Sequence, residues 1–152
     1  MTKNVIISLM GLQYVAEEED APIEIINFGQ YYKKGEKHYL LYEDTNENGA
    51  PVKCRIKVSK DELELQKRDS LHTRLLFVPG EEYFTNYETP YGSVLVGVST
   101  QSLELLEEEE FLRAKLRYGL EINNERTADC TLVLKVQSCG QEASASGESP
   151  SA

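Results

Sequence analysis

Strict alternation of apolar and charged residues is the feature that most limits what this chain can fold into. The segment 52–58 reads Val-Lys-Cys-Arg-Ile-Lys-Val, and the segment 112–118 repeats the pattern with Leu, Ala, Leu and Tyr at its apolar positions. Successive side chains of a strand point to opposite faces, so this alternation separates an apolar face from a cationic one. The pattern is typical of antiparallel strands with one buried and one solvated face.

Similar runs fill most of the chain, and turn-forming residues separate them. Together with the two segments above, they predict about ten strands, since eight further runs lie at about 5–14, 23–34, 37–43, 62–68, 73–78, 82–89, 93–105 and 125–137. The acidic run 107–110 favours one helical turn within 103–112, and no longer helix is expected.

Two hairpins have connections short enough to predict their registers. A tight turn at residues 60–61 keeps apolar residues opposite one another, and a three-residue loop at 123–125 does the same for the last two strands. The expected pairs are Val58 with Leu63, Ile56 with Leu65, Lys57 with Glu64, Leu120 with Ala128, Tyr118 with Cys130, Leu116 with Leu132, and Ala114 with Leu134.

Short connections between all of these strands predict an up-and-down meander in a single domain. An open sheet of this size would leave one apolar face bare, so we expect it to close into an all-β antiparallel barrel. The expected barrel domain covers residues 1–137. Residues 138–152 are rich in Ser, Gly and Ala and form the expected disordered tail.

The charge balance narrows the range of partners. The chain has 16 Lys and Arg against 26 Asp and Glu, a formal net charge of -10, so nucleic acid is not an expected partner. The apolar run 5–16 is too short to span a bilayer and lacks a cleavage signal, so no membrane partner is expected.

The three cysteines lack the spacing of a metal site or of a disulfide framework. They fit reduced thiols and a cytoplasmic location.

Residues suited to catalysis are scarce. His38 and His72 are the only histidines, they lack metal-binding spacing, and we interpret both as ordinary surface or rim residues. Cys54 and Cys130 fall on the apolar side of their strands, which predicts buried and unreactive thiols. No nucleophile elbow or phosphate-binding loop is present. We therefore expect no metal and no cofactor, and the scarcity of catalytic residues argues against an enzyme.

The connections predict which end of the barrel is open. The turns near residues 35, 60, 80 and 107 gather at one end, and the first three of them are tight. The connections at the other end include two long ones, and they carry many acidic residues. By analogy with other barrels, the longer loops flank a mouth that would repel anions. The candidate ligand-binding residues at this mouth are Arg68, Arg74, Tyr87, Thr89 and Tyr91.

The cations are distributed unevenly. Ten of the 16 lie between Lys33 and Arg74, mostly at outward-facing strand positions, which predicts a basic wall weakened by interleaved acids. Such a wall is either an ordinary solvated face or a surface for an acidic partner.

Three segments of the chain have the appearance of a family motif: the turn Thr89-Pro90-Tyr91-Gly92, the Tyr31-Tyr32 pair followed by 39–43, and the segment from Lys67-Arg68 to 75–77. On these residues the chain resembles a small bacterial family, the DUF1934 or YwiB-like proteins. The likeness covers about residues 3–137 and differs at Asp69-Ser70, where members often have a glycine. It implies a calycin-like barrel of about ten strands with a lipocalin-like appearance, and no catalytic residues.

Two functions follow as expectations. The first is a cytosolic barrel that binds a small, partly apolar, neutral or cationic molecule. The alternative is a filled barrel that acts as a protein-interaction module through its outer surface. A cavity of about 300 Å³ or more with convergent polar groups would favour the first. An exposed apolar or basic patch would favour the second.

Overall fold

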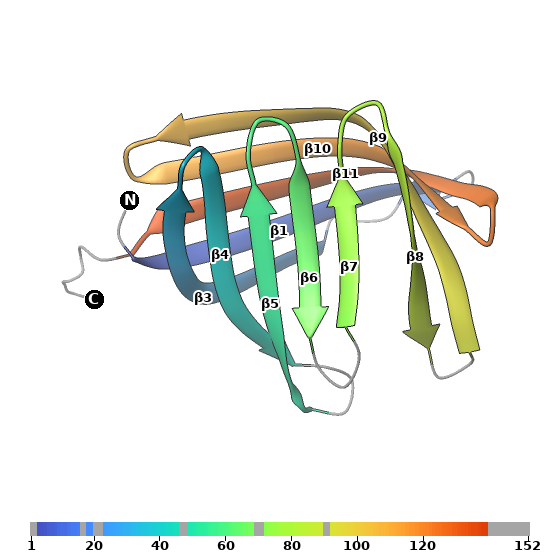
Figure 1. The fold of residues 1–152 in the computed structure, drawn as a ribbon, viewed down its shortest axis with the longest axis horizontal. Coiled ribbons are helices and arrows are strands. Elements are labelled where there is room, and N and C mark those ends of the chain that lie inside the picture. Colours follow the sequence, from blue (N-terminus) through green and yellow to red (C-terminus); the bar gives the residue numbers. More distant parts are fainter. Residues whose placement is uncertain are drawn as a thin grey trace.

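The chain folds into one curved antiparallel sheet that wraps into a nearly closed barrel (Figure 1). The computed structural model describes residues 3–15, 18–19, 23–45, 49–68, 72–89 and 92–139. Within these residues the strands are β1 (Asn4–Val15), β2 (Glu18–Glu19), β3 (Ile23–Lys34), β4 (Lys37–Thr45), β5 (Pro51–Val58), β6 (Leu63–Arg68), β7 (His72–Phe77), β8 (Glu82–Thr89), β9 (Gly92–Glu108), β10 (Phe111–Ile122) and β11 (Glu125–Ser138). The predicted all-β fold is confirmed, and the two-residue β2 is an addition to it.

Pairing of the first and last long strands closes the meander. The order of hydrogen-bonded neighbours is β7-β6-β5-β4-β3-β1-β11-β10-β9-β8. β1 runs antiparallel to β11 from Val5 opposite Ser138 to Tyr14 opposite Asp129. Within the described residues, no ladder joins β7 to β8, although the turn after Phe77 brings them side by side. The barrel is therefore continuous except along this seam.

The barrel is flattened into two layers that cross. In Figure 1, β4 to β7 run steeply across the front, while the long strands β1, β11, β10 and β9 run behind them at a large angle. The inward faces of both layers supply the core. Its buried side chains are mainly aliphatic: Val5, Ile7, Leu40, Ile56, Val58, Leu63, Phe77, Val98, Leu112, Leu116, Leu134 and Val136.

The predicted registers of both hairpins are confirmed. Val58 lies opposite Leu63 and Lys57 opposite Glu64, as the alternation of β5 requires. All four predicted pairs between β10 and β11 also form. The predicted three-residue loop is wrong, because Ile122 pairs with Glu125 across a two-residue turn. The extra residue forms a bulge beside Leu120 instead, and this bulge preserves the apolar pairing beyond it.

The predicted helical turn within 103–112 is also wrong. β9 stays extended through Glu108, and a tight turn leads directly into β10. Leu103, Leu105 and Glu107 lie opposite Leu116, Ala114 and Leu112 on the inward face, so pairing with β10 overrides the helical preference of the glutamates.

The first residues of the predicted tail, which starts at residue 138, belong to the described part of the chain. β11 ends at Ser138, and the backbone amide of Cys139 donates to Asn4 O at 3.1 Å. The rest of the tail, 140–152, lies outside the described residues.

Candidate functional site

A chain of polar side chains lies where two hairpin turns meet at one end of the barrel. The turn between β3 and β4, where Gly35 has a φ of 64°, faces the turn between β9 and β10 (Figure 1). Lys33 pairs with His38 across the first hairpin, and the next inward position on β3 is Tyr31. Glu107 occupies the last inward position of β9. Strand alternation thus directs all four side chains toward the end of the barrel interior.

These four residues form a continuous chain of polar contacts. Tyr31 Oη lies 2.7 Å from His38 Nδ1, and His38 Nε2 lies 3.4 Å from Glu107 Oε1. Lys33 Nζ donates a hydrogen bond to Glu107 Oε2 at 3.0 Å. Glu107 therefore joins two hairpins that are more than seventy residues apart in the sequence, and it ties β9 to β3 and β4.

The histidine ring is fixed in one protonation state by its surroundings. His38 is 1% exposed, and this burial lowers its pKa even though the charge of Glu107 opposes the shift. A carboxylate only accepts hydrogen bonds, so the neutral ring carries its proton on Nε2 and accepts at Nδ1. Tyr31 must then be the donor to Nδ1. Burial followed by the Glu107 charge raises the pKa of Tyr31, so its phenol keeps that proton.

An open pocket of about 830 Å³ adjoins this chain. We call it the end pocket, and its lining residues are Lys3, Gln30, Tyr31, Tyr32, Lys33, Glu107, Glu108 and Glu109. Among these described residues, three carboxylates face two ammonium groups, and two phenol rings supply apolar surface. The arrangement can hold a small molecule against aromatic rings and hydrogen-bond acceptors.

A second pocket of about 440 Å³ lies between β3, β4 and β5. Its lining includes Phe28, Tyr42 and Cys54. Burial raises the pKa of the Cys54 thiol, which agrees with the prediction that this cysteine is buried and unreactive. The end pocket is the better functional candidate because it combines volume with a linked set of titratable groups.

The structure describes the sequence-predicted rim residues only in part. Arg68 is exposed at the last position of β6, opposite His72. Tyr87 and Thr89 pair with Val94 and Gly92, but their side chains lie outside the described part. Tyr91 lies wholly outside it. The rim site at the longer loops therefore stays a prediction, and the end pocket lies at the opposite, tight-turn end of the barrel.

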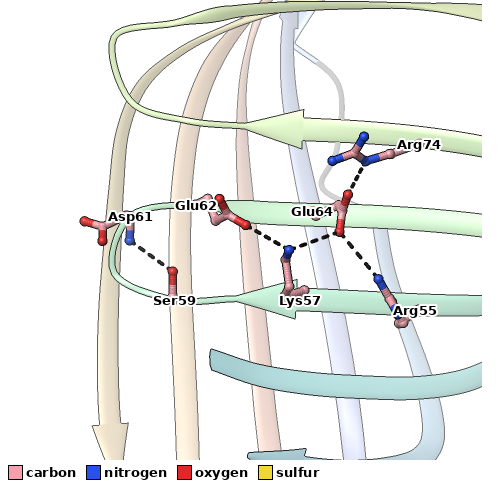
Figure 2. Close-up of polar contacts among 7 residues, drawn as sticks. All are labelled: Arg55, Lys57, Ser59, Asp61, Glu62, Glu64 and Arg74. Carbon is pink, nitrogen blue, oxygen red and sulfur yellow. Dashed lines mark hydrogen bonds and ion pairs between the residues drawn. The ribbon is translucent and has the colours of Figure 1, made fainter. Parts of the chain in front are cut away.

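Arg74, the fifth predicted rim residue, takes part in an ion cluster on the outer wall (Figure 2). Its Nε donates to Glu64, and its guanidinium lies 5.9 Å from the ring centre of Tyr83. Glu64 also lies 3.7 Å from Arg55 Nη2 and 3.7 Å from Lys57 Nζ. Although Glu64 faces outward, its side chain is only 3% exposed, because these cations surround it (Figure 2).

Opposing effects set the ionisation of Glu64. Its burial is the largest single effect and would raise the pKa, but the hydrogen bond from Arg74 and the nearby positive charges together lower it. Glu64 therefore stays ionised and neutralises part of the predicted basic wall. Arg74 is positioned by this contact and does not line the end pocket.

The interpretation of His38 as a surface or rim residue is wrong, since the ring is buried. One signal was available: His38 occupies the same parity as Leu40, which is a core position. Glu107 belongs to the acidic run 107–110, for which a helical turn was expected, although it continues the inward alternation of Leu103 and Leu105. The contact between His38 and Glu107 forms only when the barrel closes, so no pattern in the neighbouring sequence indicates it. The side chain of His72 lies outside the described residues.

The described part of the chain was compared with the requirements of a metal site and of a membrane-spanning helix. No group of three or more His, Cys, Asp or Glu residues there has the geometry to hold a metal ion. The same residues contain no helix that is long and apolar enough to cross a membrane. All three cysteines are free thiols.

Comparisons with known proteins agree on the fold. A family model described as a domain of unknown function, DUF1934, matches residues 7–134. The uncharacterized beta-barrel protein YwiB of Bacillus subtilis (strain 168) is 30% identical over 112 residues, which cover 72% of this chain and 78% of that protein. The crystal structure of ywiB protein from Bacillus subtilis has a TM-score of 0.77 at 21% identity, covering 89% of this chain and 91% of that chain. The structural similarity shows a shared fold.

Proposed function

Because this chain belongs to the DUF1934 family of β-barrel proteins, a family defined without an activity, we propose a function from its own geometry. The protein binds a small, partly apolar, neutral or cationic molecule in the end pocket. The observation that carries this proposal is a pocket of about 830 Å³ with a buried Tyr31–His38 pair behind one wall. Ligand sites combine such volume with a few fixed polar groups and aromatic surface.

The proposal places the ligand at the end of the barrel and not at its centre. Large side chains such as Phe77, Leu116 and Leu134 are fully buried in the core. The polar groups that could orient a ligand converge instead at the tight-turn end. Three free thiols support a cytoplasmic protein, and the net charge of -10 disfavours nucleic acid as a partner.

Native mass spectrometry of the protein purified from its own cytosol tests this function. We expect a co-purifying small molecule that is lost from the double variant Tyr32→Ala, Glu108→Gln, since both side chains line the pocket and both are exposed. Arg68→Ala is the matched control and should retain the molecule. Loss from the Arg68 variant alone would move the site to the predicted rim. Wild-type protein that carries no small molecule would contradict the proposal.

One observation favours the alternative function, protein interaction through the outer surface. Ile26 and Phe28 lie on the outward face of β3, and Phe28 is 75% exposed. Large exposed apolar side chains that lie together are typical of interaction sites. Under this alternative, Phe28→Ser would abolish a co-purifying protein partner, and the pocket double variant would retain it.

A further inference from the structure

We infer that the ligand of the end pocket is a small organic ammonium ion that carries at least one N–H and an apolar arm. The inference rests on the proposed function and specifies the chemical class of its ligand. Three independent properties of the pocket wall lead to it: the direction of a hydrogen-bond chain, the balance of charge and the presence of an exposed aromatic ring.

The hydrogen-bond chain leaves an acceptor at the wall. His38 Nε2 lies 3.4 Å from Glu107 Oε1, so we assign the proton of the neutral ring to Nε2, and Nδ1 then accepts from the Tyr31 hydroxyl at 2.7 Å. The single phenolic proton of Tyr31 is committed to this contact. Tyr31 is one of the residues that line the pocket, so a ligand group that reaches its hydroxyl oxygen meets a lone pair. A ligand that matches this wall must donate a hydrogen bond.

The charge balance selects among donors. Lys33 and Glu107 neutralise one another through their 3.0 Å contact. Among the described residues that line the pocket, the charges that remain are the Glu108 and Glu109 carboxylates against the ammonium of Lys3. This surplus of negative charge favours a cationic donor over a neutral one and disfavours an anion.

The aromatic surface suits the same class of ligand. Tyr32 lines the pocket and is 42% exposed. Its ring stacks on Tyr39 with 4.8 Å between ring centres and an angle of 4° between planes, so it is held in a fixed orientation. The face of a phenol ring attracts organic cations and packs against an apolar arm.

Titration of four matched probes separates the three properties. The probes are 2-phenylethylamine, 2-phenylethanol, 3-phenylpropanoate and trimethyl(2-phenylethyl)ammonium, and the measurement is the amide NMR shifts of residues 31–33 and 107–109. We expect the amine to bind tightest. The alcohol should bind about tenfold more weakly, because it offers a neutral hydrogen-bond donor in place of a charged one. The trimethylammonium probe should fall between them, and the propanoate should not bind.

Two variants test the residues that carry the inference. Tyr31→Phe removes the acceptor and keeps the ring, so the amine should lose about tenfold in affinity and its advantage over the trimethylammonium probe. Glu108→Gln with Glu109→Gln alters only exposed side chains, and it should weaken both cations alike. Unchanged affinities in both variants would overturn the inference.

The outcomes distinguish this inference from the proposed function. Binding of the alcohol or propanoate as tightly as the amine, with the same residues shifted, would overturn the ammonium class and leave a small-molecule site in place. The absence of shifts with all four probes would also overturn it. The proposed function then depends on its own test, the co-purifying molecule and its loss from the pocket variant.

Discussion

At the scale of single residues, two buried titratable side chains determine the polar character of this barrel. His38 stays neutral inside the end of the barrel because burial lowers its pKa, and its ring lies between the Tyr31 hydroxyl and the Glu107 carboxylate. Glu64 stays ionised on the outer wall because surrounding cations lower its pKa against the effect of burial. Each residue depends on partners from neighbouring strands or hairpins.

Glu64→Gln should destabilise the protein at neutral pH by about 1–2 kcal/mol. Removal of one partner of a buried ion pair costs about 3–5 kcal/mol, and here the partially exposed Arg55 and Arg74 reduce that cost. Because the folded pKa of Glu64 lies below its unfolded value, the stabilisation is present above the unfolded pKa and is lost as pH falls through the folded pKa.

Urea unfolding at pH 7 and at about pH 3 measures this effect. The difference between wild type and Glu64→Gln should shrink at the lower pH. Glu62→Gln is the matched control, since Glu62 contacts the same Lys57 at 3.1 Å but is more exposed, and it should cost less than about 0.5 kcal/mol. A Glu64 effect that is as small as the control effect would show that the cluster adds no stability.

At the scale of elements, the β10–β11 hairpin shows how a turn and a bulge together maintain register. Asn123 and Asn124 have φ values of 52° and 70°, which a two-residue turn of this kind requires. Two hydrogen bonds also attach Asn123 to Leu95 of β9. The backbone N–H of Asn123 donates to Leu95 O at 2.8 Å, and its side-chain Oδ1 accepts from the backbone N–H of Leu95 at 3.1 Å. The neighbouring strand thus stabilises the tight turn over a longer loop.

Asn124→Ala should lower the free energy of unfolding by about 1 kcal/mol, because alanine tolerates a positive φ less well than asparagine. Asn124→Gly is the control, and it should match or exceed the wild-type stability. Urea unfolding followed by circular dichroism measures both variants. Equal stability of the alanine variant would argue against the positive φ of this turn in solution.

At the scale of the whole molecule, crossing of the two layers packs the barrel interior. Leu116 of β10 is fully buried in a core that also includes Leu40, Ile56 and Leu63 of the other layer. The interior therefore behaves as one core. The polar chain and the end pocket occupy the region where this packing stops, between the β3–β4 and β9–β10 turns.

Leu116→Ala should cost about 2–5 kcal/mol, the range for a large-to-small change in a packed core. Leu106→Ala removes the same groups from an exposed position, where Leu106 is 39% accessible, and it should cost less than about 1 kcal/mol. Urea unfolding of both variants tests the assignment. Equal costs would contradict a packed interior at Leu116.

The fold was predictable because its signals are local. Alternation in β5 and β10 identifies strands from a few neighbouring residues, and the apolar parity of Val58 and Leu63 fixes their register. The hairpin loop was predicted less well, since its length depends on the contact between Asn123 and Leu95. The extended form of Glu107 likewise depends on pairing with β10.

The candidate site was not predictable in the same way. Strand period and turn residues act over short distances, so they predict an all-β chain with alternating strands, a closing meander and buried cysteines. The contacts among Tyr31, His38, Lys33 and Glu107 beside a pocket at the tight-turn end form only in the folded barrel. Closure of the barrel joins hairpins that are distant in the sequence, and burial then lowers the pKa of the histidine.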